Sequence, residues 1–404
     1  MAKPVKVLLL THNYPRRRDD YAGVFLGLLA RRLTALNIQP IVVAPHDAEV
    51  PEREETDGIR IYRFRYAADP EKQTLAYRGN MHEQVLGSPL GPFRLQAFLR
   101  GFERLTREVI EREQIDIIAG HWLIPTGVVM KRLRAVTKIP MILSSHGTDI
   151  RLLAKFGRPL YRYFRPLTRR LSRWTVVSSF LREELVKLDP ACEGLIEVLP
   201  LPHNEKVFFR EADVKREDNL VVAVTRFTDQ KRVDILIRAF HWVTREERSA
   251  RLEIYGSGPL DARIRALVAE LGLERQVIIN EPVSQERLRE IYNRAAVVVL
   301  NSFREGFGLA LSEAMLCGTA VIGTASGGIC DIIEDKKRGL LVELDNINQL
   351  AEAILTLLKN TVYRDRLAEH GYRFARSTYA SGPLAARYAD IVRTAIEAGR
   401  PVPD

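Results

Sequence analysis

Two glutamates, Glu305 and Glu313, frame the stretch of the chain with the clearest potential for chemistry. Gly306 and Gly308 follow the first glutamate, and the apolar run after them predicts a helix over residues 309–317. A helix that glycines open presents unpaired N–H groups and the positive end of its dipole at its first turn. These features suit the binding of a phosphate, so the stretch predicts an anion site with a carboxylate on each side.

Both glutamates also have plain structural interpretations, which the sequence leaves open. Ser302 and Glu305 have the spacing of a capping box, and Glu313 could point into solvent. Two glycines in a first turn weaken a helix by roughly 1 kcal/mol each, which favours close approach of the backbone to another group over a simple cap. Glu313 has no Lys or Arg three or four residues away, so its carboxylate needs water or a ligand as a partner.

A second group of charges follows a strand predicted over residues 220–224. Arg226 and Lys231 lie in the loop between this strand and a helix predicted over residues 233–243. Arginine offers a planar fork and lysine a point charge, and together they can neutralise the charge that grows on a departing pyrophosphate. The structural alternative is a pair of surface cations without a function.

Two histidines follow two successive predicted strands in the N-terminal half. His121 comes after the strand at residues 115–119, and His146, with Asp149, comes after the strand at residues 140–144. Ligands of parallel α/β sheets bind at the carboxyl ends of the strands, so all three side chains are candidates for a ligand site. A lone loop histidine is more often a hydrogen-bonded structural residue, and that interpretation stays open.

The rest of the chain must supply the elements that position these loops. Short apolar runs alternate with amphipathic helical patterns, and 404 residues with 46% hydrophobic content fit two doubly wound α/β domains. A net charge of +10 indicates an anionic partner such as a nucleotide or a phospholipid surface. No apolar run approaches the ~18 residues of a membrane span. The three cysteines lack disulfide or metal spacing, so we expect a soluble or peripheral cytoplasmic protein.

The most basic stretch is residues 158–174, which contains six arginines and no Asp or Glu. Tyr161, Tyr163 and Phe164 lie between these arginines, and Trp174 ends the stretch. The pattern predicts docking on the anionic headgroups of a membrane surface, with a solvated helix face as the alternative. No known nucleic-acid-binding module fits the chain, so we expect no nucleic-acid partner.

The motif from Glu305 to Glu313, with Gly-Phe-Gly after the first glutamate, resembles the signature of retaining glycosyltransferases of the GT-B fold, family 4. The resemblance implies two Rossmann-like α/β domains that face each other across a cleft. The first would span residues 1–202, completed by a C-terminal helix within residues 384–404 that crosses back to it. The second would span residues 203–383 and bind a nucleotide sugar, while the first would bind the acceptor.

The resemblance also implies roles for individual residues. Glu305, His121, Arg226 and Lys231 would take part in catalysis, and His146 and Asp149 would lie on the acceptor side. The donor-binding residues would be Gly23, Arg226, Lys231, Gly256, Val283, Gly306, Phe307, Gly308, Leu309 and Glu313.

The chain departs from the family pattern at three places. Residues 200–204 replace the usual Pro-Asn-Gly-Val-Asp crossover and lose its Asn-Gly pair. Arg232 and Glu281 stand where the family usually has glycines, so the nucleobase cannot be identified.

The resemblance implies transfer of a hexose from a nucleotide-diphosphate sugar to an acceptor hydroxyl, with retention of anomeric configuration. The acceptor would be a lipid or a saccharide, in glycolipid, polysaccharide or other glycoconjugate synthesis. No Asp-x-Asp motif is present, so we expect neither a metal nor a cofactor. The alternatives are a nucleotide-sugar epimerase of the same fold and a non-catalytic protein that binds nucleotide sugars.

Overall fold

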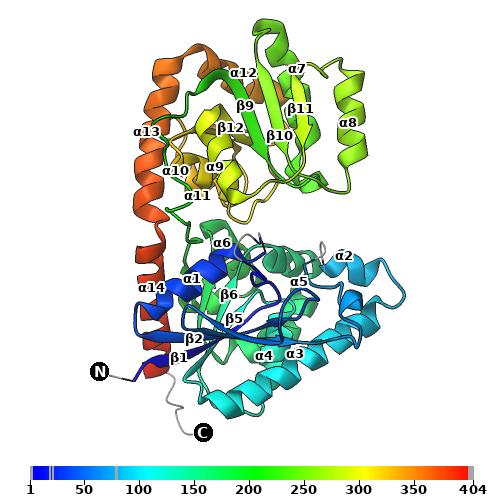
Figure 1. The fold of residues 1–404 in the computed structure, drawn as a ribbon, viewed down its shortest axis with the longest axis vertical. Helices are drawn as coiled ribbons and strands as arrows, with labels where there is room; N and C mark the ends of the chain where they lie inside the picture. Colours follow the sequence, from blue (N-terminus) through cyan, green and yellow to red (C-terminus); the bar gives the residue numbers. More distant parts are fainter. Residues whose placement is uncertain (1–2, 18–19, 21, 78–80, 399–404) are drawn as a thin grey trace. The chain divides into compact units, whose positions relative to one another are not determined.

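The computed structural model describes residues 3–17, 20, 22–77 and 81–398. It divides the chain into two compact units, which we call the first unit (residues 1–202 and 381–404) and the second unit (residues 203–380). Each unit is built on its own twisted sheet with helices packed against it (Figure 1). Residues 399–404, at the end of the predicted crossing segment, lie outside the described residues.

The sheet of the first unit has the strand order β3-β4-β2-β1-β5-β6-β7-β8. Its neighbours pair in parallel except β3 and β4, which form an antiparallel edge that the sequence did not predict. The central strands are buried apolar runs, as parallel sheets covered on both faces require. The strands are β1 (Val5–Leu10), β2 (Ile38–Pro45), β3 (Arg53–Thr56), β4 (Ile59–Phe64), β5 (Ile117–His121), β6 (Met141–Ser145), β7 (Leu171–Val176) and β8 (Ile196–Val198).

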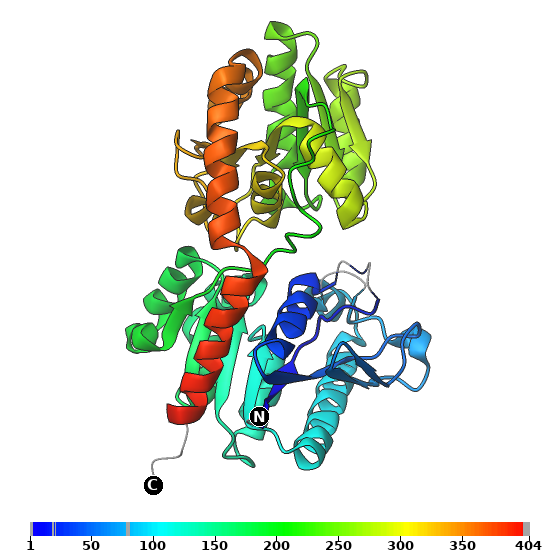
Figure 2. The same cartoon turned by 60° about the vertical axis from the view of Figure 1, so that its left-hand side comes forward.

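The last helix of the chain, α14 (Ser381–Ala398), belongs to the first unit and packs against α1, β5, β6 and β7 (Figure 2). It buries Leu384, Tyr388 and Val392 in the core of that unit. The sequence predicted this helix within residues 384–404, but it begins earlier, at Ser381. Pro383 lies in its first turn, where the backbone N–H that proline lacks would have no partner inside the helix. The other helices are α1 (Val24–Thr34), α2 (Met81–Leu86), α3 (Gly91–Glu113), α4 (Thr126–Leu133), α5 (Thr148–Thr168) and α6 (Ser179–Leu188).

The sheet of the second unit is parallel throughout, with the strand order β11-β10-β9-β12-β13-β14. Its strands are β9 (Glu217–Val224), β10 (Arg251–Tyr255), β11 (Val277–Asn280), β12 (Ala295–Leu300), β13 (Ala320–Thr324) and β14 (Leu340–Val342). Its helices are α7 (Val233–Glu246), α8 (Asp261–Glu270), α9 (Gln285–Arg294), α10 (Leu309–Leu316), α11 (Ile329–Ile332), α12 (Ile347–Lys359) and α13 (Thr361–Thr378).

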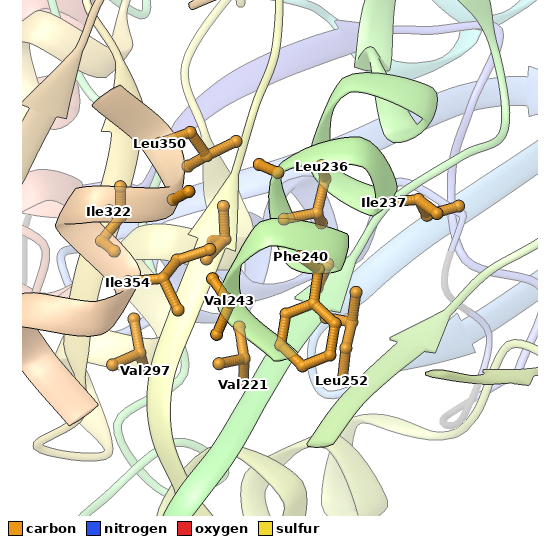
Figure 3. Close-up of a cluster of buried hydrophobic side chains, with 14 of the residues drawn as sticks. Val221, Leu236, Ile237, Phe240, Val243, Leu252, Val297, Ile322, Leu350 and Ile354 are labelled. Atoms are coloured by element: carbon orange, nitrogen blue, oxygen red, sulfur yellow. The ribbon is translucent and has the colours of Figure 1, made fainter. Parts of the chain in front are cut away.

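Aliphatic side chains from β9, β10, β12 and β13 and from helices α7 and α12 form the core of the second unit. Figure 3 shows Phe240 of α7 and Ile354 of α12 above Val221 and Val297 of neighbouring strands. Such burial is the main favourable term in folding, at about 25 cal/mol per Å² of apolar surface. These two sheets with their flanking helices confirm the predicted class of two Rossmann-like α/β domains.

The strand order of each sheet reverses direction at one place, between β1 and β5 in the first unit and between β9 and β12 in the second. The connections that follow these strands therefore leave on opposite sides, and ligands of α/β proteins bind at such switch points. All the predicted anion-binding and histidine loops lie at the carboxyl ends of strands, and those after β5, β9 and β12 lie at the two switch points themselves.

Candidate functional site

The loop after β12, residues 301–308, is held on two sides by neighbouring loops of the second unit. Ser302 N donates to Thr324 Oγ1 at 3.1 Å, and Arg304 N donates to Ser326 Oγ at 2.8 Å. On the other side Phe303 N donates to the carbonyl of Gln230 at 2.8 Å. The loop therefore has little freedom to move, which fixes the side chain of the residue that comes next.

Glu305 is that residue, and its carboxylate already has polar partners within the second unit. Lys231 forms an ion pair with Oε2 of Glu305, and Ser302 Oγ donates to the same oxygen at 2.8 Å. The two charged side chains are 19% and 14% exposed, so the pair is half-buried and less screened than a surface pair. The arrangement brings together Lys231 of the predicted pyrophosphate loop and Glu305 of the predicted anion site, which are 74 residues apart in the chain.

The capping-box interpretation of Ser302 and Glu305 is wrong. Helix α10 begins at Leu309, and its N-cap is Gly308 with φ 113°, without a side-chain cap. Ser302 bonds to Glu305 itself rather than to the helix. The start of α10 is therefore lined by backbone, and Leu309 is 39% exposed there, which leaves the positive end of the helix dipole open to an anion.

Glycines let the neighbouring loops approach this backbone closely. A Cβ on Gly327 would lie 2.3 Å from the carbonyl oxygen of Glu305, and one on Gly328 would lie 2.5 Å from that of Gly306. A Cβ on Gly256 would lie 1.8 Å from the carbonyl oxygen of Thr225. Gly256 therefore packs directly on the loop that carries Arg226. This is a structural role, different from the donor contact predicted for Gly256.

Three further residues predicted to bind the donor are placed as follows. Arg226 is exposed on the loop after β9, and Val283 is half-buried in the loop after β11. Phe307 is only 4% exposed, and its ring packs 5.4 Å from the ring of Tyr379. Its side chain therefore belongs to the core, and only its backbone can meet a ligand.

Glu313, on the second turn of α10, is half-buried and has no cationic partner among the ion pairs of the described residues. Tyr292 of α9 donates its hydroxyl to Oε2 of Glu313 at 3.2 Å. Burial raises the pKa of Glu313 to about 8, and the hydrogen bond from Tyr292 offsets only part of this effect. The sequence predicted a carboxylate in need of a partner but gave no signal for Tyr292, which is 21 residues away.

In the first unit the structure brings His121 and His146 into contact. His121 ends strand β5 rather than lying in the following loop, and it is 1% exposed. Its Nδ1 lies 3.1 Å from Nε2 of His146, and its Nε2 lies 3.4 Å from the hydroxyl of Tyr388. Burial lowers the pKa of His121 to about 3 and that of His146 well below its usual value. Both imidazoles are therefore neutral at pH 7.

Asp149, predicted on the acceptor side, lies in the first unit and has a buried carboxylate. It is 1% exposed, and its carboxylate accepts N–H bonds from Leu123 at 2.8 Å and from Gly147 at 3.1 Å. The amide of His146 lies 3.3 Å from the same carboxylate. Asp149 therefore ties the loop after His121 to the loop that carries His146, and buried amide donors explain why a carboxylate is held there.

Gly23 caps helix α1 with φ 61°, in the left-handed region that favours glycine. A Cβ there would lie 2.3 Å from the carbonyl oxygen of Asn13, so the loop after β1 also requires a glycine for packing. The positive φ and the close packing explain why a glycine occupies position 23, with no need for contact with a ligand.

The basic stretch at residues 158–174 splits between the end of α5 and strand β7. Tyr161, Phe164 and Trp174 are buried in the first unit, and only Tyr163 among the four aromatic residues is exposed. Its arginines at 158, 162, 165, 169 and 170 are exposed. The stretch therefore presents charge to solvent without most of the apolar anchors that the sequence suggested.

Two family models match the chain and meet at residues 204–205, next to the boundary of the two units. Glycosyltransferase Family 4 matches residues 22–205, and Glycosyl transferases group 1 matches residues 204–374. An uncharacterized glycosyltransferase of Methanocaldococcus jannaschii is 30% identical over 287 residues, which cover 71% of this chain and 78% of that protein. The chain therefore belongs to the family 4 glycosyltransferases with the GT-B fold.

Two other proteins show how far the similarity extends. The GDP-mannose-dependent alpha-(1-6)-phosphatidylinositol monomannoside mannosyltransferase of Mycobacterium tuberculosis is 25% identical, over 96% of this chain and 98% of that protein. Sucrose-phosphate synthase of Thermosynechococcus elongatus has the same fold, with a TM-score of 0.80 and 21% identity over 98% of this chain and 100% of that one. The two sequence relatives support glycosyl transfer as the activity, and the solved structure shows that the fold is shared.

Among the residues that the structure describes, no helix is both long enough and apolar enough to cross a membrane.

Proposed function

We propose that this chain transfers a hexose from a nucleoside-diphosphate sugar to an acceptor hydroxyl and that the anomeric configuration of the sugar is retained. The second unit would bind the donor, and the first unit would bind the acceptor. The observation that carries the proposal is the cluster in the second unit where Lys231, Glu305 and the glycine-lined start of α10 meet.

The cluster suits a diphosphate that departs as a leaving group. Lys231 supplies a charge next to the open first turn of α10, and Arg226 lies in the same loop as Lys231. Charges placed before the reaction stabilise the charge that develops on the leaving oxygen, without reorganisation at that moment. Glu305 holds Lys231 in position, so a bound diphosphate would share the lysine with this carboxylate.

Glu313 would accept hydrogen bonds from the ribose hydroxyls of the donor, the role that the family resemblance implies. The raised pKa of Glu313 supports this role. Burial without a cation destabilises its carboxylate, and hydrogen bonds donated by two hydroxyls would stabilise it. The reaction would be a front-face substitution in which the leaving phosphate accepts the proton of the acceptor hydroxyl. Both neutral histidines of the first unit fit that scheme, because neither would need to act as the base.

The direct test of the proposal is a binding screen followed by product analysis. Titration calorimetry with UDP, GDP, ADP and their common hexose derivatives should identify one nucleoside diphosphate that binds the wild type and binds at least tenfold more weakly to Lys231→Ala. NMR of the product should then show the same anomeric configuration as in the donor. An inverted product would contradict retention, and a change of sugar configuration without an acceptor would identify an epimerase.

A lipid acceptor is one of the two acceptor classes that the resemblance implies. We propose that the exposed arginines of residues 158–170 dock the enzyme on anionic lipid, because each basic residue near such a surface contributes about 1 kcal/mol. Vesicle flotation should recover more protein with anionic than with neutral lipid, and the difference should disappear in 0.5 M salt, since the Debye length is then only a few Å. Equal recovery from both vesicles would exclude this surface.

A further inference from the structure

A chain of hydrogen-bonding groups crosses the core of the first unit and reaches the two histidines. Thr175 Oγ1 donates to Ser144 Oγ at 2.7 Å, and Ser144 in turn hydrogen-bonds Tyr388 of α14. The hydroxyl of Tyr388 faces Nε2 of His121, and Nδ1 of His121 faces Nε2 of His146. The planes of the two histidine rings lie 10° from parallel and their centroids are 5.4 Å apart, an arrangement compatible with an N–H···N bond between the facing nitrogens.

The tautomers of the two histidines are coupled, because the hydrogen-bonded groups that connect them share a limited number of protons. Each neutral imidazole carries one N–H and one acceptor nitrogen. Only one proton fits between Nδ1 of His121 and Nε2 of His146. If His121 donates, both residues are Nδ1–H tautomers, and if His146 donates, both are Nε2–H tautomers. The pair therefore always has the same tautomer.

The contact between Tyr388 and His121 decides which tautomer forms. A phenol is a stronger acid than a neutral imidazole, and an imidazole nitrogen is a stronger base than a phenol oxygen. The hydroxyl of Tyr388 therefore donates to Nε2 of His121, whose proton must then lie on Nδ1.

We propose that Tyr388 is a positioning residue that fixes His121 and His146 together as Nδ1–H tautomers, so that Nδ1 of His146 is a hydrogen-bond donor for an oxygen of a bound substrate. The last step rests on the proposed function, because it needs His146 to meet substrate. The tautomers themselves do not depend on it.

The surroundings of His146, the last residue in this series of hydrogen-bonding groups, support its role as a donor to substrate. Nδ1 of His146 is shielded from solvent and has no hydrogen-bond partner among the described residues. The ring is half-buried, and it packs 4.8 Å from Phe25 and 4.4 Å from Trp122. A buried N–H without an acceptor is unfavourable, so an oxygen that reached it would bind more tightly than at a donor already in use.

The tautomers can be measured in the whole protein by ¹⁵N NMR after labelling of its eight histidines. The His146→Gln variant assigns that residue, and His121→Gln assigns the other. At pH 7.5 the wild type should show protonated Nδ1 and unprotonated Nε2 at both positions. Tyr388→Phe should shift both residues toward the Nε2–H form, which free imidazole side chains prefer.

Two variants control for the loss of a hydroxyl. Tyr161→Phe removes a buried phenol that donates to Asp189 at 2.7 Å in the same unit, and both histidines should keep their tautomers. Ser144→Ala removes the donor to Tyr388 but leaves the phenol, so the Nδ1–H form should also remain. Nε2–H tautomers in the wild type, or tautomers that do not respond to Tyr388→Phe, would overturn the proposal.

Turnover gives the second readout. Tyr388→Phe should lower kcat about 3- to 10-fold with little change in the KM for the donor, because a neutral hydrogen bond contributes on the order of 1 kcal/mol. A tautomer shift with unchanged kcat would overturn the substrate-donor role of His146. Failure of the proposed function would look different, because the wild type would then show the expected tautomers and transfer no sugar at all.

Discussion

The two units hold their polar clusters by opposite electrostatic means. In the second unit Lys231 and Glu305 form a half-buried ion pair beside the open start of a helix. In the first unit His121 and His146 are neutral, and their ring nitrogens bond to each other and to Tyr388. The first arrangement suits a charged ligand. The second suits a neutral ligand whose hydroxyl groups must be oriented by hydrogen bonds.

This difference shows how one fold can serve two tasks. An anion site must keep its cations partly hydrated, because a fully buried charge costs several kcal/mol. A site for neutral hydroxyls can be buried completely, provided that every donor has an acceptor. The comparison therefore predicts that variants in the second unit change binding and turnover of the charged donor, while variants in the first unit change orientation.

Loss of the lysine should have the largest effect. Lys231→Ala removes a preorganised cation and leaves Glu305 without its ion-pair partner, so kcat/KM should fall by about 100-fold while the protein stays folded. Steady-state release of the nucleoside diphosphate measures this. Lys337→Ala is a matched control, because Lys337 pairs with Glu334 at the surface of the same unit and should change kcat/KM less than twofold. Wild-type activity in Lys231→Ala would show that the ion pair is structural.

A steric change next to the anion site should come second. Gly256→Ala places a Cβ 1.8 Å from the carbonyl oxygen of Thr225, so the loop that carries Arg226 must move. We expect a loss of about 2–4 kcal/mol in the free energy of unfolding. Gly272→Ala is the control, because Gly272 has φ +66° but no atom within 4 Å of its Cβ position, and it should cost only about 1 kcal/mol. Urea denaturation measures both, and equal losses would mean that the close contact is not real.

The smallest effect concerns pH. An unfolded glutamate titrates near 4.5, while Glu313 titrates at about 8 in the folded protein. Between these values the folded state holds a proton that the unfolded state lacks, so this group makes stability fall as pH rises. Glu313→Gln should remove that slope and be more stable than the wild type at pH 8.5, with little difference at pH 5.

The histidines of the first unit should respond in the opposite direction. The pKa of His121 is about 3 when folded and 6.5 when unfolded, so its contribution is lost as pH falls below 6.5. Urea denaturation of wild type and Glu313→Gln at pH 5, 7 and 8.5 separates the two trends. Glu334→Gln is a suitable control, because surface partners lower the pKa of Glu334 and its variant should not gain stability at high pH.

Much of the framework could be predicted because its signals are local. The strand β9 contains the short apolar run predicted at residues 220–224, and the start of α10 follows from Gly308 and the helical pattern after it. The spacing of Arg226 and Lys231 put both cations in one loop. Helices α8 and α9 were not predicted.

The partners of the functional groups could not be predicted, because they come from distant parts of the chain. Tyr388 is 267 residues from His121, and no pattern in either segment indicates the other. Asp149 accepts hydrogen bonds from buried amides, and the ring of Phe307 packs in the core, contacts that the neighbouring sequence does not indicate. These partners are determined by which polar groups lack a hydrogen bond elsewhere in the folded structure.

The position of α14 also has a consequence for synthesis of the protein on the ribosome. The nascent first unit lacks Leu384, Tyr388 and Val392 of its own core until the whole second unit has been translated. The apolar face of the sheet that α14 covers therefore stays exposed until α14 leaves the ribosome. The contact of Tyr388 with the histidine pair can therefore form only after the second unit has been synthesised.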